Sequence, residues 1–190
     1  MPDRPYTTLS SSVSLDGYLG DRTPRLVLSN EAGFDRVDAV RASCDAIMVG
    51  AVTARTDDPR LLVRSQARRD EGKARGLASS PMKITVSDRV DLDARSNFFT
   101  AGEAEKLVYF SSSRVPDARV VHTLFLADDL VDELQLVVAP FFVGDSSAAR
   151  FVSEGRFGWN AQRRATLAEV RPIGDVVLLR YALSPRFRDG

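Results

Sequence analysis

The eight residues from 57 to 64 form the densest group of chemically capable side chains in this sequence. They read Asp-Asp-Pro-Arg-Leu-Leu-Val-Arg, so two acids and two arginines flank a short apolar stretch. The planar guanidinium of arginine matches the oxygens of a phosphate group, and the segment therefore favours binding of a polar, phosphorylated molecule. The same composition is also typical of a surface turn held by salt bridges, and both interpretations stay open at this point.

Further polar residues follow the apolar runs that predict buried strands. Gly50 ends one run, Ser87 ends a second, and Ser111 begins a Ser-Ser-Ser-Arg segment after a third. Ligands of open α/β sheets bind beyond the carboxyl ends of the parallel strands. A glycine there lets a ring or phosphate approach the backbone, and hydroxyl groups beside an arginine suit a cofactor phosphate. A plain turn for Gly50 and a solvated loop for Ser111 are the alternatives.

Alternating apolar runs and amphipathic segments predict an α/β fold. The run 46–49 is continuous and precedes a glycine, which is typical of a central parallel strand covered on both faces. The segment 172–175 separates two β-rich runs and predicts a C-terminal antiparallel hairpin. Strands are predicted at 6–15, 46–49, 83–87, 106–110, 134–143, 166–170 and 176–183, with an extended piece at 61–63. Helices are predicted at 29–43 and 122–129, and an exposed excursion at 65–80.

The first predicted helix has an apolar stripe at helical spacing. Phe34, Val37 and Val40 fall on this stripe and are expected to face the core. Asp38 and Arg41 lie off it, so the periodicity places them away from the buried side.

Composition narrows the classes of function. The chain has 190 residues, which fits a single domain spanning 1–190, and its 26 basic residues balance 26 acidic ones. A net charge of zero gives no long-range attraction to nucleic acid or to an acidic membrane. Cys44 and His122 are the only residues of their types, so a disulfide and a zinc cluster are excluded, and Cys44 is expected to be a small buried apolar residue. The sequence predicts a cytoplasmic protein without a signal peptide or a membrane span.

Three motifs in a fixed order resemble a known family. They are Ser-Leu-Asp-Gly at 14–17, Arg-Ala-Ser-Cys-Asp-Ala-Ile-Met-Val-Gly at 41–50, and Thr53 followed by the segment 57–64. This order is similar to the reductase domain of the bacterial riboflavin-biosynthesis deaminase/reductase, and the resemblance covers nearly the whole chain. It implies a dihydrofolate-reductase-like, three-layer α/β/α fold with a mostly parallel central sheet. It also implies a homodimer that uses NADPH to reduce the ribosyl group of a phosphoribosyl-aminopyrimidine to ribityl.

The resemblance also implies roles for individual residues. Thr53 and Asp57 would contact NADPH, and Ser87 would lie near it. Gly50 and Ser111 complete the expected cofactor-binding set. The residues expected to contact the phosphorylated substrate are Arg41, Leu61 and Arg64.

Asp16 of the Ser-Leu-Asp-Gly turn is the expected catalytic residue. It would lie near the reaction centre and assist proton transfer to the substrate. Its alternative role is that of a turn carboxylate which accepts hydrogen bonds from backbone amides. No metal ion is expected to take part.

Two departures from the family pattern concern the cofactor and the substrate. The family's Trp before the first helix is not found in residues 23–28, since Trp159 is the only Trp. The strand and glycine-rich loop that bind the NADPH pyrophosphate in the family are also missing, because Val121 runs directly into His122. A strand-helix-strand unit takes about 30 residues. Either the protein has lost these residues, or the sequence given leaves them out between 121 and 122, and we expect the latter. A fold without this strand would expose two strand edges.

These departures leave room for other functions. The chain could be a reductase of the same fold that acts on a pterin, a folate or a pyrimidine of an antibiotic pathway. It could also be a vestigial, non-catalytic dimeric module, or use a hydride donor other than NADPH. Measured turnover and NADPH binding would separate these alternatives.

Overall fold

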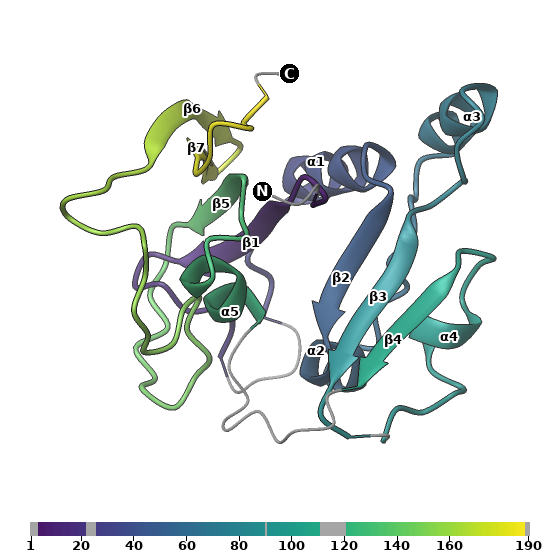
Figure 1. Cartoon of the computed structure of the whole chain (residues 1–190), viewed down its shortest axis with the longest axis horizontal. Coiled ribbons are helices and arrows are strands. Elements are labelled where there is room, and N and C mark those ends of the chain that lie inside the picture. Colours follow the sequence, from purple (N-terminus) through teal and green to yellow (C-terminus); the bar gives the residue numbers. More distant parts are fainter. Residues whose placement is uncertain (1–3, 22–25, 90, 111–120, 189–190) are drawn as a thin grey trace. The chain divides into compact units, whose positions relative to one another are not determined.

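The computed structural model describes residues 4–21, 26–89, 91–110 and 121–188. The chain forms two compact units. The first comprises Met1–Gly33 with Arg119–Gly190, and the second comprises Phe34–Ala118. Each unit has its own sheet (Figure 1), and the two are described separately below.

The first unit is built on a four-stranded sheet in the order β1-β5-β7-β6. Its strands are β1 (Thr8–Ser14), β5 (Glu133–Ala139), β6 (Thr166–Ile173) and β7 (Val176–Ala182), and its helix is α5 (Val121–Ala127). The pair β1–β5 is parallel, whereas β5–β7 and β6–β7 are antiparallel. The predicted C-terminal hairpin is therefore confirmed. Its turn contains Gly174 with a φ of 63°, a conformation that glycine adopts without a steric cost.

Apolar side chains form two clusters in the first unit. One lies on β5, β6 and β7, and the other joins β1 to the segments around α5 and the C-terminus. Trp159 packs against the second cluster, where the guanidinium of Arg163 lies 3.9 Å from its ring centroid. The buried members are Val137, Ala139, Ile173, Val176 and Leu178 in the first cluster, and Leu9, Val131 and Leu183 in the second.

The second unit holds a parallel three-stranded sheet in the order β2-β3-β4. The strands are β2 (Ala46–Gly50), β3 (Met82–Ser87) and β4 (Lys106–Phe110). The helices are α1 (Glu31–Ala42, which begins just before the unit boundary), α2 (Ala51–Thr56), α3 (Gln66–Ala74) and α4 (Asn97–Thr100). The predicted α/β fold with parallel strands is thus confirmed. The expected excursion at 65–80 contains α3, a helix without buried residues.

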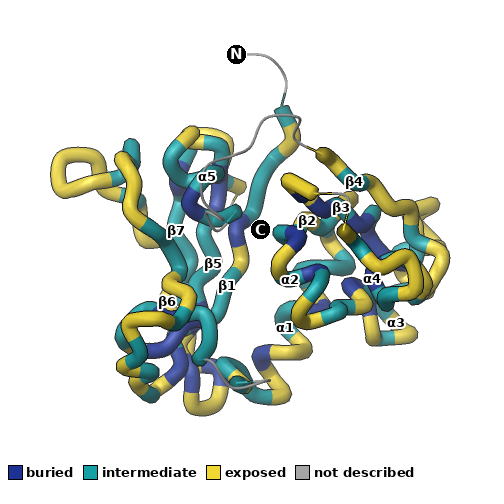
Figure 2. The backbone as a smooth tube through the Cα atoms, turned by 90° about the horizontal axis from the view of Figure 1, so that it is seen from below, coloured by how far each residue is buried: buried dark blue, intermediate teal, exposed yellow. Residues whose placement is uncertain are grey.

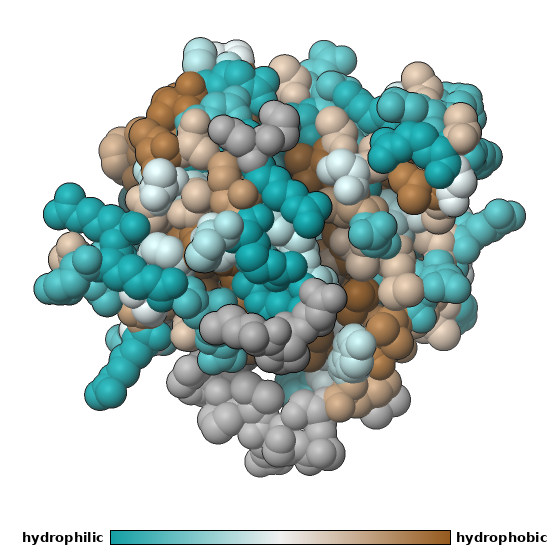
Figure 3. All heavy atoms as spheres, turned by 45° about the horizontal axis from the view of Figure 1, so that its top comes forward, coloured by the Kyte–Doolittle hydropathy of each residue, from teal (hydrophilic) through white to brown (hydrophobic). Residues whose placement is uncertain are grey.

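Two expectations about burial are wrong. Strand β2 was expected to be covered on both faces, but it lies at the end of its sheet and Met48 is 36% exposed. Strand β4 is also largely exposed (Figure 2), although its apolar residues predicted a buried strand. Apolar residues accordingly reach the surface among polar ones (Figure 3). The physical reason is that β2 and β4 are the end strands of this sheet, and among the described residues each pairs only with β3.

The stripe predicted for α1 is also wrong in part. Phe34 is 42% exposed, whereas Asp38 is only 3% exposed. Helical periodicity assumes that burial follows hydrophobicity, but a carboxylate can be buried where enough donors surround it. Cys44, expected to be buried, is only partly buried.

Lys83 of β3 is fully buried beneath α4. Its Nζ donates to the carbonyl oxygens of Asn97 at 3.3 Å, Phe98 at 3.1 Å and Ala101 at 2.7 Å. Burial, with a smaller effect of the Lys106 charge, lowers the pKa of this ammonium group. Lys83 therefore supplies a donor to the carbonyl groups of Phe98 and Ala101 near the end of α4, where helical carbonyls run out of backbone partners.

Replacing Lys83 by Met is expected to lower the free energy of unfolding by about 1–3 kcal/mol, because buried carbonyl oxygens lose their donor. Urea denaturation followed by circular dichroism measures this change. Lys106→Met is the matched control, since Lys106 is the register partner of Lys83 on β4 but is exposed. Equal midpoints for the two variants would contradict the assigned role.

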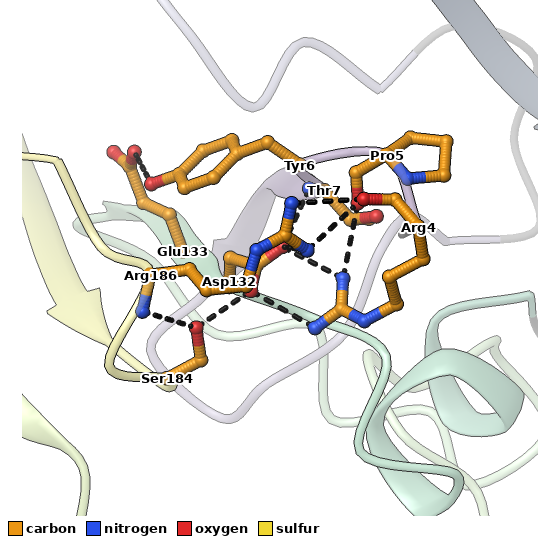
Figure 4. Close-up of polar contacts among 8 residues, drawn as sticks. All are labelled: Arg4, Pro5, Tyr6, Thr7, Asp132, Glu133, Ser184 and Arg186. Atoms are coloured by element: carbon orange, nitrogen blue, oxygen red, sulfur yellow. Dashed lines mark hydrogen bonds and ion pairs between the residues drawn. The ribbon is translucent and has the colours of Figure 1, made fainter. Parts of the chain in front are cut away.

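Asp132 closes the first unit where its N-terminal and C-terminal segments meet (Figure 4). Its fully buried carboxylate accepts hydrogen bonds from Arg4 at 2.7 and 2.9 Å and from the Ser184 hydroxyl at 2.6 Å. The Thr7 amide donates to it at 2.9 Å, and Arg186 adds an ion pair at 3.4 Å. One side chain thus connects three segments that are distant in the sequence.

None of the described helices is long and apolar enough to cross a membrane.

Candidate functional site

Two of the predicted substrate-binding residues come together in the second unit. Arg41 lies in the last turn of α1, and Arg64 follows the loop after α2. Arg41 donates to the carbonyl of Leu62, two residues before Arg64, and its pKa is lowered by burial and, to a smaller extent, by the positive charge of Arg64. Within the described part of the chain neither forms an ion pair.

The donors of these arginines are only partly used. Arg41 Nη1 donates to the Leu62 carbonyl at 3.3 Å, while its buried Nε has no hydrogen-bond partner. The guanidinium of Arg64 lies 5.4 Å from the ring centroid of Phe34. A buried polar atom without a partner calls for an explanation, and an anion between two cations would satisfy both the charge and the free N–H group.

The loop that carries Arg64 has an unusual backbone. Asp58 and Leu61 adopt φ angles of 42° and 52°, a left-handed conformation that is uncommon for residues other than glycine. Asp58 accepts hydrogen bonds from the backbone and side-chain amides of Asn97, both at 2.6 Å. Leu61 is 3% exposed, so its side chain anchors the loop. Such strain is kept only where the surrounding contacts determine the conformation.

Side chains fasten the backbone between Leu62 and Ser65. Besides the bond from Arg41 to Leu62, the Ser80 hydroxyl accepts the N–H of Val63 at 3.1 Å. Arg69 Nη1 donates to the carbonyls of Val63 at 2.6 Å and of Arg64 at 2.8 Å. The backbone at Arg64 is therefore held in place by these hydrogen bonds.

The predicted cofactor-binding residues differ in their location and in whether their polar groups are already hydrogen-bonded. Gly50 ends β2 and is the N-cap of α2, and the N–H of Asp57 donates to the Thr53 carbonyl at 3.0 Å, one helical turn away. The Asp57 carboxylate accepts only from Thr56, at 3.2 Å among the described contacts. Ser87 is 2% exposed and its hydroxyl is bonded to Arg89 at 2.6 and 3.2 Å. Ser111 lies outside the described residues.

Thr53 and Asp57 carry groups that a dinucleotide cofactor can bind. A hydroxyl and a carboxylate one turn apart suit the ribose hydroxyl and amide groups of a nicotinamide cofactor. Thr53 and Asp57 therefore fit this group, with Gly50 allowing close approach, whereas the Ser87 hydroxyl is already used within its own turn.

Asp16, the predicted catalytic residue, lies in the first unit. Its carboxylate accepts hydrogen bonds from the Ser14 hydroxyl at 2.5 Å and from the amides of Gly144 at 2.8 Å and Val143 at 3.1 Å. Burial acts to raise its pKa, but these hydrogen bonds outweigh that effect and lower the pKa to about 2. The carboxylate is thus ionised at neutral pH and stabilises a turn, and its part in catalysis stays a prediction.

Two cavities in the second unit are not lined jointly by the predicted cofactor-binding and substrate-binding residues. One of about 130 Å³ contains Arg41, Cys44, Arg75 and Ser80 among its lining residues. The other, of about 300 Å³, lies between α2 and α4 and contains Arg55, Asp58 and Asp91. Among the described residues no group of three or more His, Cys, Asp or Glu residues could hold a metal ion.

Comparison with known proteins identifies the family. Residues 5–121 and 118–179 match the RibD C-terminal domain. The chain belongs to this family of riboflavin-biosynthesis pyrimidine reductases. The RibD match falls into two parts that overlap at residues 118–121, next to the place where a missing segment was expected.

Two curated relatives carry the same name, 2,5-diamino-6-ribosylamino-4(3H)-pyrimidinone 5′-phosphate reductase. The protein of Methanothermobacter thermautotrophicus is 27% identical over 213 positions, covering 95% of this chain and 99% of the relative. Since the chain has 190 residues, at least 23 of these positions have no counterpart here. The protein of Archaeoglobus fulgidus is 40% identical over 95 residues, which are 48% of this chain and only 43% of the relative.

A solved structure shows the same fold. A pyrimidine reductase-like protein of Corynebacterium diphtheriae matches with a TM-score of 0.73 at 16% identity, over 94% of this chain and 91% of that protein. The predicted α/β fold of the RibD reductase type is thereby confirmed.

Proposed function

We propose that this chain is an NADPH-dependent reductase that converts the ribosyl group of a phosphoribosyl-aminopyrimidine to ribityl. Membership of the RibD family and the names of the relatives support the reaction class. The observation that carries the assignment of substrate is the pair Arg41 and Arg64, two arginines linked by the bond from Arg41 to Leu62 and without an ion-pair partner among the described residues. Such a pair suits a phosphate ester, because arginine donors match phosphate oxygens.

The residues of the second unit perform the binding steps of this reaction. Arg41 and Arg64 hold the substrate phosphate, while Thr53 and Asp57 hold the cofactor. Once the sugar ring opens, C1′ of the resulting imine is the electrophilic atom. When bound, NADPH would supply the hydride that C1′ accepts, and the proton that the nitrogen needs would come from water. Orientation of the reactants can supply several kcal/mol of the rate enhancement, within the ~7–11 kcal/mol available from this effect.

Asp16 stays the proposed catalytic residue. With a pKa of about 2 its carboxylate is ionised at neutral pH, so its proposed role is that of a charged group and not of a proton donor.

We further propose that the natural protein carries an additional segment between 121 and 122 and that the whole chain works as one reductase domain. The two-part family match and the single-sided pairing of β1 and β2 support this proposal. The intact mass of the protein from its natural source is the test. A mass of 20.9 kDa would contradict the proposal, and a mass larger by at least 23 residues would support it.

Turnover measurements test the proposed reaction directly. Purified protein is given NADPH with either the phosphoribosyl-aminopyrimidine or dihydrofolate, and oxidation of NADPH is followed by absorbance. Reduction of the first substrate alone is expected. Reduction of dihydrofolate alone would favour a different reductase of this fold, and no NADPH binding at millimolar concentration would favour a non-catalytic module. A homodimer in the cytoplasm is part of the proposal, and the oligomeric state is measured by light scattering.

A further inference from the structure

Asp38 is a buried carboxylate directly behind the two arginines. It lies on α1, one turn before Arg41, and is 3% exposed. Its oxygens accept the backbone N–H groups of Arg64 and of Ser65, the latter at 3.0 Å. Arg68 of α3 donates a third hydrogen bond to it at 3.0 Å. A charge at this depth is tolerated only when it is paired and hydrogen-bonded, and these three donors meet that condition.

The contacts of Asp38 end on the backbone of Arg64 and leave its guanidinium free. Asp38 also attracts the guanidinium of Arg41 without forming an ion pair with it. Asp38 is itself held ionised: burial acts to raise its pKa, but the bonds from Arg64, Ser65 and Arg68 lower it. The carboxylate therefore fixes the backbone of the loop, but it forms no ion pair with the guanidinium group of Arg41 or of Arg64.

Arg68 completes the arrangement from the solvent side. It pairs with Asp35 at 2.6 and 2.8 Å as well as with Asp38. Asp35 is 66% exposed and contacts neither Arg41 nor Arg64 among the described interactions. Asp35 and Asp38 thus share one cation, but only Asp38 reaches the loop that carries Arg64. This difference provides a matched pair of acidic residues for an experiment.

We propose that Asp38 is a positioning residue for substrate binding, which fixes the backbone of Arg64 two residues from Leu62, the residue whose carbonyl accepts a hydrogen bond from Arg41. This inference rests on the proposed function, since it assumes that the two arginines bind the substrate phosphate. Asp38 does not contact the substrate in this arrangement, because a carboxylate facing the phosphate would repel it. Its effect on the reaction is transmitted entirely through Arg64 and Arg41.

The main test compares Asp38→Asn with Asp35→Asn in steady-state kinetics. Asp38→Asn is expected to raise KM for the phosphorylated substrate about 10-fold with kcat changed less than about 3-fold, the pattern of lost binding that is equal in ground and transition states. Asp35→Asn is expected to leave both constants within about 2-fold. Inhibition by inorganic phosphate should weaken in parallel with the rise in KM for Asp38→Asn. An unchanged KM and phosphate inhibition in a folded Asp38→Asn protein would overturn the proposal.

A double-mutant cycle separates positioning from a general structural role. If Asp38 acts through Arg64, Asp38→Asn should have little further effect on KM in an Arg64→Ala background. A full additional increase would show that Asp38 acts elsewhere, and the inference would be wrong. If Arg64→Ala itself leaves KM unchanged, the proposed phosphate site fails first, so the two failures are distinguishable.

A milder variant keeps the test valid if Asp38→Asn does not fold. Arg69→Ala removes the bonds to the carbonyls of Val63 and Arg64 and leaves Asp38 in place. It loosens the same stretch of backbone and is expected to raise KM in the same direction by a smaller factor. No change in KM for a folded Arg69→Ala protein, together with an unfolded Asp38→Asn protein, would assign Asp38 to stability alone and contradict the proposal.

Discussion

Replacing Asp132 by Asn is expected to lower the free energy of unfolding by about 2–3 kcal/mol. Removing one partner of a buried ion pair costs about 3–5 kcal/mol, because the other charge loses its compensation. The loss here falls below that range, since the side chains of Arg4 and Arg186 are 28% and 39% exposed and water can solvate them. Ser184 and the Thr7 amide would also face a neutral amide in place of a carboxylate.

Thermal and urea denaturation measure this loss. For a protein of this size, 2–3 kcal/mol corresponds to a decrease in Tm of roughly 4–12 °C. Asp93→Asn is the matched control, because Asp93 is 67% exposed and its partner Arg95 is 94% exposed at 3.7 Å. Exposed pairs contribute about 0–1 kcal/mol. If the two variants had the same midpoint, the network around Asp132 would be shown to contribute nothing beyond a surface pair.

The contribution of Asp132 should depend on pH in the acid range. Burial acts to raise the pKa of Asp132, but hydrogen bonds from Arg4, Ser184 and Thr7 lower it below its ordinary value in the folded protein. A lowered folded-state pKa stabilises the protein above the unfolded-state value of about 3.9. This stabilisation is lost as the pH falls through the folded-state pKa. The difference in unfolding free energy between wild type and Asp132→Asn should therefore shrink below about pH 4, and a constant difference would contradict this origin.

Replacing Arg64 by Ala is expected to raise KM for the phosphorylated substrate about 10- to 100-fold. Hydrogen bonds to charged groups contribute about 1.5–3 kcal/mol each, which corresponds to this range of affinity. The site loses one of two cations, and Arg41 remains with its buried Nε unpartnered. The value of kcat should change less, because phosphate binding far from the reacting carbon stabilises ground and transition states alike.

Two comparisons make this prediction specific. Arg60→Ala removes an exposed arginine from the same loop and should leave KM within about 2-fold. A substrate that lacks the phosphate should be bound equally weakly by wild type and by Arg64→Ala. A similar rise in KM for both variants would mean that the loop attracts the substrate by general charge alone.

Short-range signals in the sequence determined most of the elements. The apolar runs at 83–87 and 106–110 and the turn around Gly174 correspond to β3, β4 and the hairpin β6–β7. These features were predictable because strand and turn preferences depend on neighbouring residues. The ordered motifs also determined the family, since they combine residue type with spacing. The same motifs led to the prediction of a missing segment between 121 and 122, because two matching stretches meet there without the residues expected between them.

Burial and pairing were decided only by the tertiary structure. Asp38 lies off the apolar stripe predicted for α1, and its partners Arg64, Ser65 and Arg68 are about 30 residues away. Asp132 likewise depends on Arg4 and Ser184, which come from opposite ends of the chain. Whether a carboxylate is exposed, catalytic or buried depends on donors that no local pattern specifies. The sequence by itself was therefore enough to predict Arg41 and Arg64 as substrate-binding residues, whereas only the tertiary structure shows which contacts hold them in place.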